Sequence, residues 1–136
     1  TILIVKPKLL RKVASIKISD EIDDGLEIIF KQIEVLLHKT KGFLNPNYIP
    51  ANLEVETSFR SELIRKSIKK YSSMSVPLFI NSYRVEYACE LIKKGYLKNF
   101  SMEALAEKSG FNSQENFNRV FKILKLCTPS EYNKTV

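Results

Sequence analysis

Gly110, set between two runs with helical periodicity, is the feature that most constrains how this chain can fold. Before it, Ser101 is a good N-cap for a helix whose apolar face holds Met102, Leu105 and Ala106. A glycine adopts the left-handed conformation at little cost, so Gly110 predicts the end of that helix. Phe111 then predicts an apolar corner. The sequence therefore indicates a short helix followed by a tight turn.

A second and a third helix are predicted directly after this turn. Ser113 caps the second, whose inward face carries Phe117, Val120, Phe121 and Leu124. Its outward face carries Gln114, Glu115, Asn118, Arg119 and Lys122. In the third, Thr128 is the N-cap, Pro129 suits the first turn and Glu131 completes a capping box. This pattern predicts a helix-turn-helix, an arrangement that places one helix in the DNA major groove.

The spacing of these residues resembles the DNA-binding domain of AraC/XylS-type transcription regulators. The matching residues are Leu105, Ala106, Gly110, Phe111, Ser113, Phe117, Arg119, Phe121, Lys122, Thr128, Pro129 and Tyr132. The resemblance implies an all-α fold of about seven helices, with two helix-turn-helix subdomains joined by a long connecting helix. Two positions depart from the family pattern, since Leu126 replaces a glycine and Lys125 an aromatic residue. A β-carbon in the left-handed conformation costs about 1–2 kcal/mol, so we expect a rebuilt helix end or strain at Leu126.

The connecting helix is predicted to run from near Val76 to Lys94, with Ser75 as its N-cap and Gly95 after its end. It has two apolar stripes. One consists of Ile80, Tyr83, Tyr87 and Leu91, and the other of Leu78, Val85, Ala88 and Ile92. A helix that is apolar on more than one side is expected to be buried between two partners.

The first helix-turn-helix unit matches the family less well. By spacing, Leu53–Thr57 is its first helix and Ser61–Lys70 its recognition helix. The residues expected to point inward are Leu53, Leu63, Ile64 and Ile68. Glu54 stands where the family has a small alanine, and Thr57 where it has a leucine. Because a buried unpaired carboxylate is costly, this helix must shift or let Glu54 reach water.

A further helix is predicted over residues 20–39. The acidic residues Asp20, Glu21, Asp23 and Asp24 favour a helix start there. The expected inward stripe is Ile22, Leu26, Ile29, Ile33 and Leu36. Ile28 and Val35 lie one heptad apart on the other side. Two hypotheses are open for them: cover by Val13, Ile16 and Ile18, which we favour, or a dimer contact.

These elements divide the chain into a tail or linker from a missing upstream region, residues 1–19, and an AraC-type domain, residues 20–136. The domain comprises a first unit over 20–75, a connecting helix over 76–95 and a second unit over 96–136. Thr1–Val5 is apolar but too short to span a bilayer, which takes roughly 20 residues. An ordinary linker or strand end is favoured. The other hypothesis is the last turn of an upstream transmembrane helix that tethers the domain to a membrane.

Charge and composition agree with a polyanionic partner. The 136 residues carry a net charge of +7 with a pI near 9.4. Residues 60–70 hold five cations, Arg60, Arg65, Lys66, Lys69 and Lys70, against Glu62 alone. Two cysteines, Cys89 and Cys127, form no disulfide framework and fit a cytoplasmic location.

The sequence favours no enzyme, cofactor or metal. His38 is the only histidine and no cysteine or carboxylate cluster surrounds it in the sequence. No phosphate-binding glycine loop or metal-ligand spacing occurs, and Asp23 and Asp24 are explained by their place at a helix start.

From the resemblance, we expect sequence-specific binding of double-stranded DNA in the major groove, as the output domain of a bacterial transcription regulator of the activating kind. The candidate contacts are Arg60, Ser61, Arg65, Lys66, Lys69, Asn112, Ser113, Gln114, Asn118, Arg119 and Lys122. RNA polymerase is a second partner that the resemblance allows, and dimerisation stays open. One alternative is a helical protein-interaction module that keeps the fold with weak or nonspecific DNA binding. The other is an RNA or nonspecific nucleic-acid binder, which the core-like Phe111, Phe117 and Phe121 disfavour.

Overall fold

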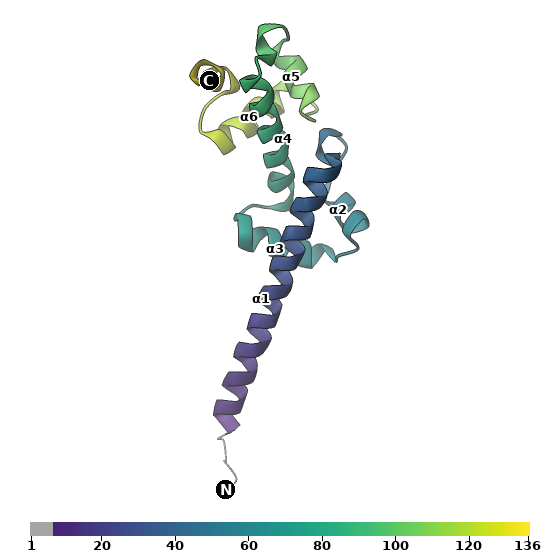
Figure 1. The fold of residues 1–136 in the computed structure, drawn as a ribbon, viewed down its shortest axis with the longest axis vertical. Helices are drawn as coiled ribbons and strands as arrows, with labels where there is room; N and C mark the ends of the chain where they lie inside the picture. Colours follow the sequence, from purple (N-terminus) through teal and green to yellow (C-terminus); the bar gives the residue numbers. More distant parts are fainter. Residues whose placement is uncertain (1–6) are drawn as a thin grey trace.

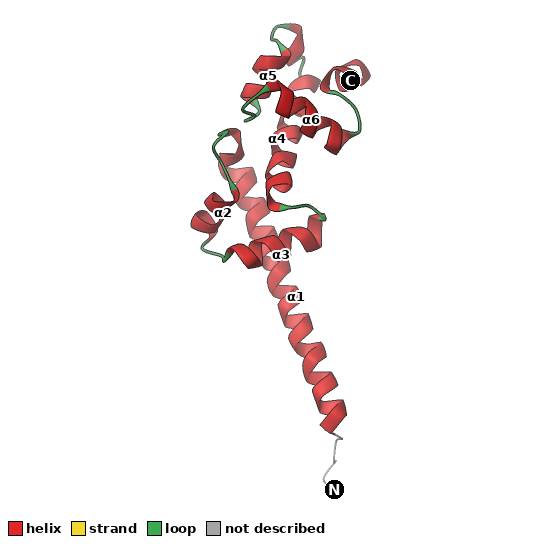
Figure 2. Cartoon of the chain, turned by 180° about the vertical axis from the view of Figure 1, so that it is seen from behind, coloured by secondary structure: helices red, strands yellow, loops and turns green. Residues whose placement is uncertain are grey.

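The structure is a computed structural model that describes the backbone of residues 7–136 and the side chains of residues 19–136. The described chain forms helices and loops without a strand (Figure 2). The helices are α1 Pro7–Thr40, α2 Pro50–Thr57, α3 Ser61–Ser72, α4 Val76–Lys93, α5 Met102–Lys108, α6 Gln114–Lys125 and α7 Pro129–Thr135. Two 3₁₀ turns, η1 Gly42–Leu44 and η2 Tyr96–Lys98, complete them. The predicted all-α fold is confirmed, whereas the expectations for Thr1–Val5 lie outside the described residues.

Two bundles share the long helix α4 (Figure 1). The first core combines α1, α2 and α3 with the first half of α4, which contributes Val76, Phe79 and Ile80. The second core combines α5 and α6 with the second half of α4, which contributes Val85, Ala88, Cys89 and Ile92. The connecting helix is therefore confirmed. It is apolar on more than one side because each half of it is buried by a different unit.

Local capping determines where the helices of the second unit begin. Ser101, Ser113 and Thr128 accept hydrogen bonds at 3.1 Å from the backbone N–H groups three residues ahead. The Thr128 hydroxyl also donates to the Glu131 carboxylate at 3.1 Å. Gly110 follows α5 with φ 93°, a left-handed conformation. The predicted starts of α5, α6 and α7 are confirmed because caps depend only on near neighbours in the chain.

The start predicted for the first helix is wrong. Instead of beginning near residue 20, α1 begins at Pro7, so the acidic residues lie inside a 34-residue helix. Its buried stripe is Leu26, Ile29, Ile33 and Leu37, whereas Ile22 is exposed and Leu36 only half-buried. Burial needs a partner, and the half of α1 before this stripe extends away from the bundle (Figure 1).

The favoured cover for Ile28 and Val35 is also wrong. Both side chains are exposed on α1. Residues 13–18 belong to the same helix, and its rise of about 1.5 Å per residue places residue 18 about 15 Å along the axis from Ile28. A helix does not fold back on itself, so these residues cannot cover that face. The side chains of Val13, Ile16 and Ile18 lie outside the described part.

In the first unit, α2 begins at Pro50, earlier than predicted, and ends at Thr57 as expected. Glu54 is half-buried and reaches the surface, where it avoids the cost of a buried charge. The inward assignment of Leu63 is wrong, since this residue is 38% exposed. Ser67 is buried in its place, together with Ile64 and Ile68. The reason is tertiary, because α1 packs on the side of α3 that carries Ser67.

Of the two expectations for this helix end, the structure agrees with the second, a left-handed Leu126. Leu126 ends α6 in the left-handed region, with φ 61° and ψ 18°. Its side chain is 88% exposed, so the leucine gains almost no burial there. Lys125, the other departure, pairs with Glu86 of α4, and this hydrogen bond raises the pKa of the lysine. A polar contact to α4 thus replaces the aromatic residue of the family pattern.

Leu126→Gly should raise the free energy of unfolding by about 1 kcal/mol, because it removes left-handed strain without removing a buried side chain. Chemical denaturation measures this difference. Leu126→Ala is the matched control, since it keeps the β-carbon and should change stability much less. Equal effects of the two substitutions would contradict the assignment of strain.

Candidate nucleic-acid interface

Helices α3 and α6 are built on the same twelve-residue frame. In each, the fourth, seventh and eighth residues are the buried ones. These are Ile64, Ser67 and Ile68 in α3, and Phe117, Val120 and Phe121 in α6. The same spacing holds each helix against its own core and leaves the opposite face outward.

The outward faces carry polar or charged residues at the second, fifth, sixth and ninth positions of each helix. In α3 these are Glu62, Arg65, Lys66 and Lys69, and in α6 they are Glu115, Asn118, Arg119 and Lys122. All are exposed except Asn118, which is half-buried. The two faces share an acid at the second position and cations at the sixth and ninth positions. They differ at the fifth position and at the first, where Ser61 corresponds to Gln114.

The predicted contact residues at the helix starts are also exposed. Arg60 is the N-cap residue of α3, and its side chain makes no capping bond. Asn112 precedes α6, and Ser113 is its N-cap. The first backbone N–H groups of a helix lack intrahelical partners, and a helix N-terminus attracts anions. Both helix starts therefore suit a phosphate group.

Several cations already have polar neighbours on the protein. Lys66 and Glu62 form an ion pair at 3.0 Å, and this hydrogen bond lowers the pKa of Glu62. The Arg119 Nη2 group donates to Asn116 Oδ1 at 2.6 Å. Because these pairs are exposed, they cost little to exchange for a phosphate.

Lys70 does not belong to the outward face. Its Nζ pairs with Asp23 of α1 at 2.5 Å, so the basic cluster predicted over residues 60–70 offers four outward cations, not five. The contact is a tertiary one, since it joins residues far apart in the chain, and periodicity alone does not show it.

Asn118 lies at the edge of the outward face. Among the residues whose side chains are described, its Oδ1 is covered and has no hydrogen-bond partner. A bidentate contact with adenine uses both the oxygen and the nitrogen of the amide. The Asn118 side chain must therefore turn outward before it can make such a contact, whereas Gln114 is already exposed.

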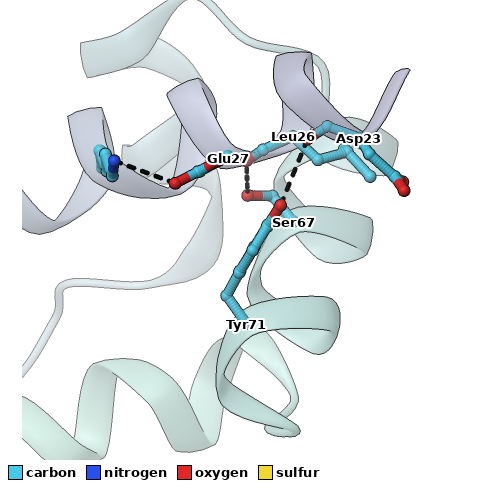
Figure 3. A network of polar contacts seen from close by, with 6 residues as sticks. Asp23, Leu26, Glu27, Ser67 and Tyr71 are labelled. Carbon is cyan, nitrogen blue, oxygen red and sulfur yellow. Dashed lines mark hydrogen bonds and ion pairs between the residues drawn. The ribbon is translucent and has the colours of Figure 1, made fainter. Parts of the chain in front are cut away.

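Polar contacts fix the back of α3 to α1 (Figure 3). The Ser67 hydroxyl donates to the Leu26 carbonyl at 2.6 Å, and the Tyr71 hydroxyl donates to the Asp23 carbonyl at 3.2 Å. The Tyr71 ring also packs on Phe30, with centroids 5.4 Å apart. Sequence reasoning missed Ser67 because a serine at this position resembles a surface residue. The pattern that could have identified Ser67 is the spacing shared with α6, in which the buried Val120 occupies the corresponding position.

Comparison with known proteins agrees with this geometry. A family model described as a helix-turn-helix domain matches residues 57–135. The C-terminal domain of AraT, a response regulator from Geobacillus stearothermophilus, superposes with a TM-score of 0.67 at 20% identity, over 82% of this chain and 88% of that one. A DNA-binding transcriptional dual regulator from Escherichia coli K-12 gives a TM-score of 0.61 at 20% identity, over 79% and 90%. At such identities the two structures show the fold alone.

A longer relative matches in sequence. The chain is 29% identical over 125 residues to the TCP pilus virulence regulatory protein of Vibrio cholerae serotype O1. The match covers 92% of this chain but only 41% of that protein. The chain thus spans less than half the length of this relative.

Two helix-turn-helix units on one connecting helix define a DNA-binding domain. The chain belongs to the AraC-type helix-turn-helix family of transcription regulators. This family is not enzymatic. In the described part of the chain, no helix is long and apolar enough to cross a membrane.

Ser67→Ala should lower the free energy of unfolding by about 1 kcal/mol, because it leaves α1 and α3 without a buried hydrogen bond. Urea denaturation of the two proteins measures the change. Ser61→Ala, at an exposed position of the same helix, is the control and should stay within about 0.5 kcal/mol of the parent. If both substitutions cost the same, the Ser67 contact to α1 is not stabilising.

Proposed function

We propose that the domain binds double-stranded DNA sequence-specifically, with α3 and α6 in two successive major-groove segments on one face of the duplex. The observation that supports this most directly is the shared frame of the two helices, each with exposed cations at the sixth and ninth positions. Two equivalent helices on one connecting helix suit a duplex that presents equivalent grooves at a fixed interval.

The proposed contacts divide by chemistry. Lys66, Lys69, Arg119 and Lys122 hold phosphates, together with Arg60, Ser61, Asn112 and Ser113 at the helix starts. Arg65 reads guanine, and Gln114 and Asn118 read adenine, because these side chains match the acceptors and donors of those bases in the major groove. The first unit then supplies mainly electrostatic affinity, and the second supplies more of the base discrimination.

We further propose that the domain is the output part of a transcription activator that works with RNA polymerase in the cytoplasm. Support comes from the family, and from the regulatory proteins named among the relatives. The division of residues 20–136 into a first unit, a connecting helix and a second unit belongs to the same proposal, whereas the boundary predicted after residue 19 falls inside α1. The first experiment selects a duplex that this chain binds from a random pool. It then compares the affinity of the chain for the selected duplex with its affinity for random duplex. Equal affinity for both would favour the protein-interaction module instead.

The affinity should fall steeply with salt. If about five to eight phosphates are contacted, the slope of log K against log salt is about −0.9 per phosphate. Lys69→Ala should flatten this slope by about one contact and weaken selected and random duplexes by similar factors, since a phosphate contact carries no sequence information. Fluorescence anisotropy over a salt series measures both effects. A salt-independent affinity would refute the phosphate contacts.

Gln114→Ala and Asn118→Ala should each lose about 1–3 kcal/mol of discrimination at one or two base pairs. Neither side chain is charged, so affinity for random duplex should barely change. Arg65→Ala should weaken both, because its charge attracts phosphates even where the fork reads guanine. Competition against duplexes substituted at each base pair in turn provides the measurement. A uniform loss on every duplex for the two amide variants would refute base reading by α6.

A further inference from the structure

Arg84 is a buried cation at the point of α4 where the two cores meet. Only 8% of it is exposed. Its Nε donates to the Phe43 carbonyl at 2.6 Å, and its Nη2 donates to the Asn45 and Tyr48 carbonyls at 3.1 Å each. Its Nη1 donates to Asn81 Oδ1 at 2.8 Å. One side chain of the shared helix thus binds three carbonyl groups of the loop between α1 and α2.

This loop, residues 42–48, also touches the second unit. A β-carbon on Gly110 would lie 2.5 Å from the Phe43 carbonyl oxygen, 3.0 Å from Leu44 Cα and 3.1 Å from Arg84 Nε. Gly110 is therefore required twice, once for its positive φ and once because the loop backbone passes so close. The side chains of Phe43 and Tyr48 are anchored in the first core. The loop is fixed in one unit and abuts the turn of the other.

The contact continues to the start of α6. Pro46 of the loop lines a cleft of about 240 Å³ together with Phe111, Asn112 and Gln114. The loop therefore reaches the residues that begin the second recognition helix. Two connections then join the units, since α4 runs through both and the loop spans them beside it.

The arginine gives the second connection its stiffness. A guanidinium is planar and presents its donors in a fixed fork, so three carbonyls bound by one fork are held in one relative geometry. Burial lowers the pKa of Arg84, but an arginine stays charged in proteins, and bonds from a charged donor are stronger than neutral ones. If the loop moved, a buried charge would lose its partners, which is strongly unfavourable.

We propose that Arg84, the loop of residues 42–48 and Gly110 form a rigid joint that fixes the separation and rotation of α3 and α6, and so makes the domain selective for the spacing of two half-sites. Arg84 is a positioning residue that contacts no base. One inserted base pair shifts a half-site by about 3.4 Å and turns it by about 35°. The proposal rests on the function proposed above, in which both helices bind one duplex.

The first test compares a selected duplex with versions that carry one base pair more or less between the half-sites. The parent chain should lose at least about tenfold in affinity on the altered spacings, which is about 1.4 kcal/mol. Arg84→Lys keeps the charge but loses the fork, and Arg84→Met loses both. Each should bring the ratio between native and altered spacing closer to one, mainly by weakening the native spacing. Asn81→Ala removes only one of the four hydrogen bonds of Arg84. It is a milder change in the same joint, and it can be tested if an Arg84 variant does not fold.

Ile33→Val is the matched control, since it loosens the first core without removing any hydrogen bond of Arg84. It should lower the melting temperature and leave the spacing ratio unchanged. An unchanged ratio in the Arg84 and Asn81 variants would overturn the proposal. Equal binding of all spacings by the parent chain would also overturn it, while leaving the proposed function in place.

The second test needs no DNA. Spin labels are placed at Val55→Cys on α2 and Lys134→Cys on α7, both exposed, in a Cys127→Ser background. The parent should give one narrow distance distribution, and Arg84→Lys should give a broader or shifted one. If the chain bound no duplex at all, the proposed function would fail, and this measurement would still decide whether the joint is rigid. Identical distributions in parent and variant would overturn the joint.

Discussion

The four hydrogen bonds of Arg84 lie between two hydrophobic cores that have one helix in common. Ile80 of α4 is buried in the first core, and Val85 is buried in the second. Arg84 lies between them, at the boundary of the two cores. A hydrocarbon side chain there would leave three loop carbonyls without this donor. The arginine satisfies them and holds the loop against Gly110, and the arrangement of the two units depends on that contact.

The sequence predicts most of the second unit because its determinants are local. Ser101, Ser113 and Thr128 cap the helices that follow them, and a cap involves residues only three positions apart. The frame of α6 was equally readable, since Phe117 and Phe121 are large and apolar and lie four residues apart. Periodicity alone also placed Gln114, Asn118 and Lys122 on its outward face, and the family resemblance made them candidate contacts.

The first unit was harder to predict because its determinants are distant in the chain. Ser67 is buried only because α1 supplies the Leu26 carbonyl, 41 residues away. Leu63 is 38% exposed because α1 packs on the side of α3 that carries Ser67. The role of Arg84 was missed for the same reason, since its loop partners lie 36 to 41 residues earlier. A helical pattern places a residue on a face but does not say what packs there.

The two recognition helices are consequently held in different ways. A chain of rings supports α6, running from Phe111 through Phe117 and Phe121 to Tyr132 with centroid distances of 5.1 to 5.6 Å. The back of α3 combines the apolar packing of Ile64 and Ile68 with polar contacts to α1, made by Ser67, Lys70 and Tyr71. Of these polar contacts, the Ser67 hydrogen bond is buried, whereas the Lys70 ion pair is exposed and exchanges easily with water. Any displacement of α1 therefore acts directly on α3 and reaches α6 only through α4 and the joint at Arg84. This difference parallels the proposed division of labour, in which α6, the helix packed by the chain of aromatic rings, supplies more of the base discrimination than α3.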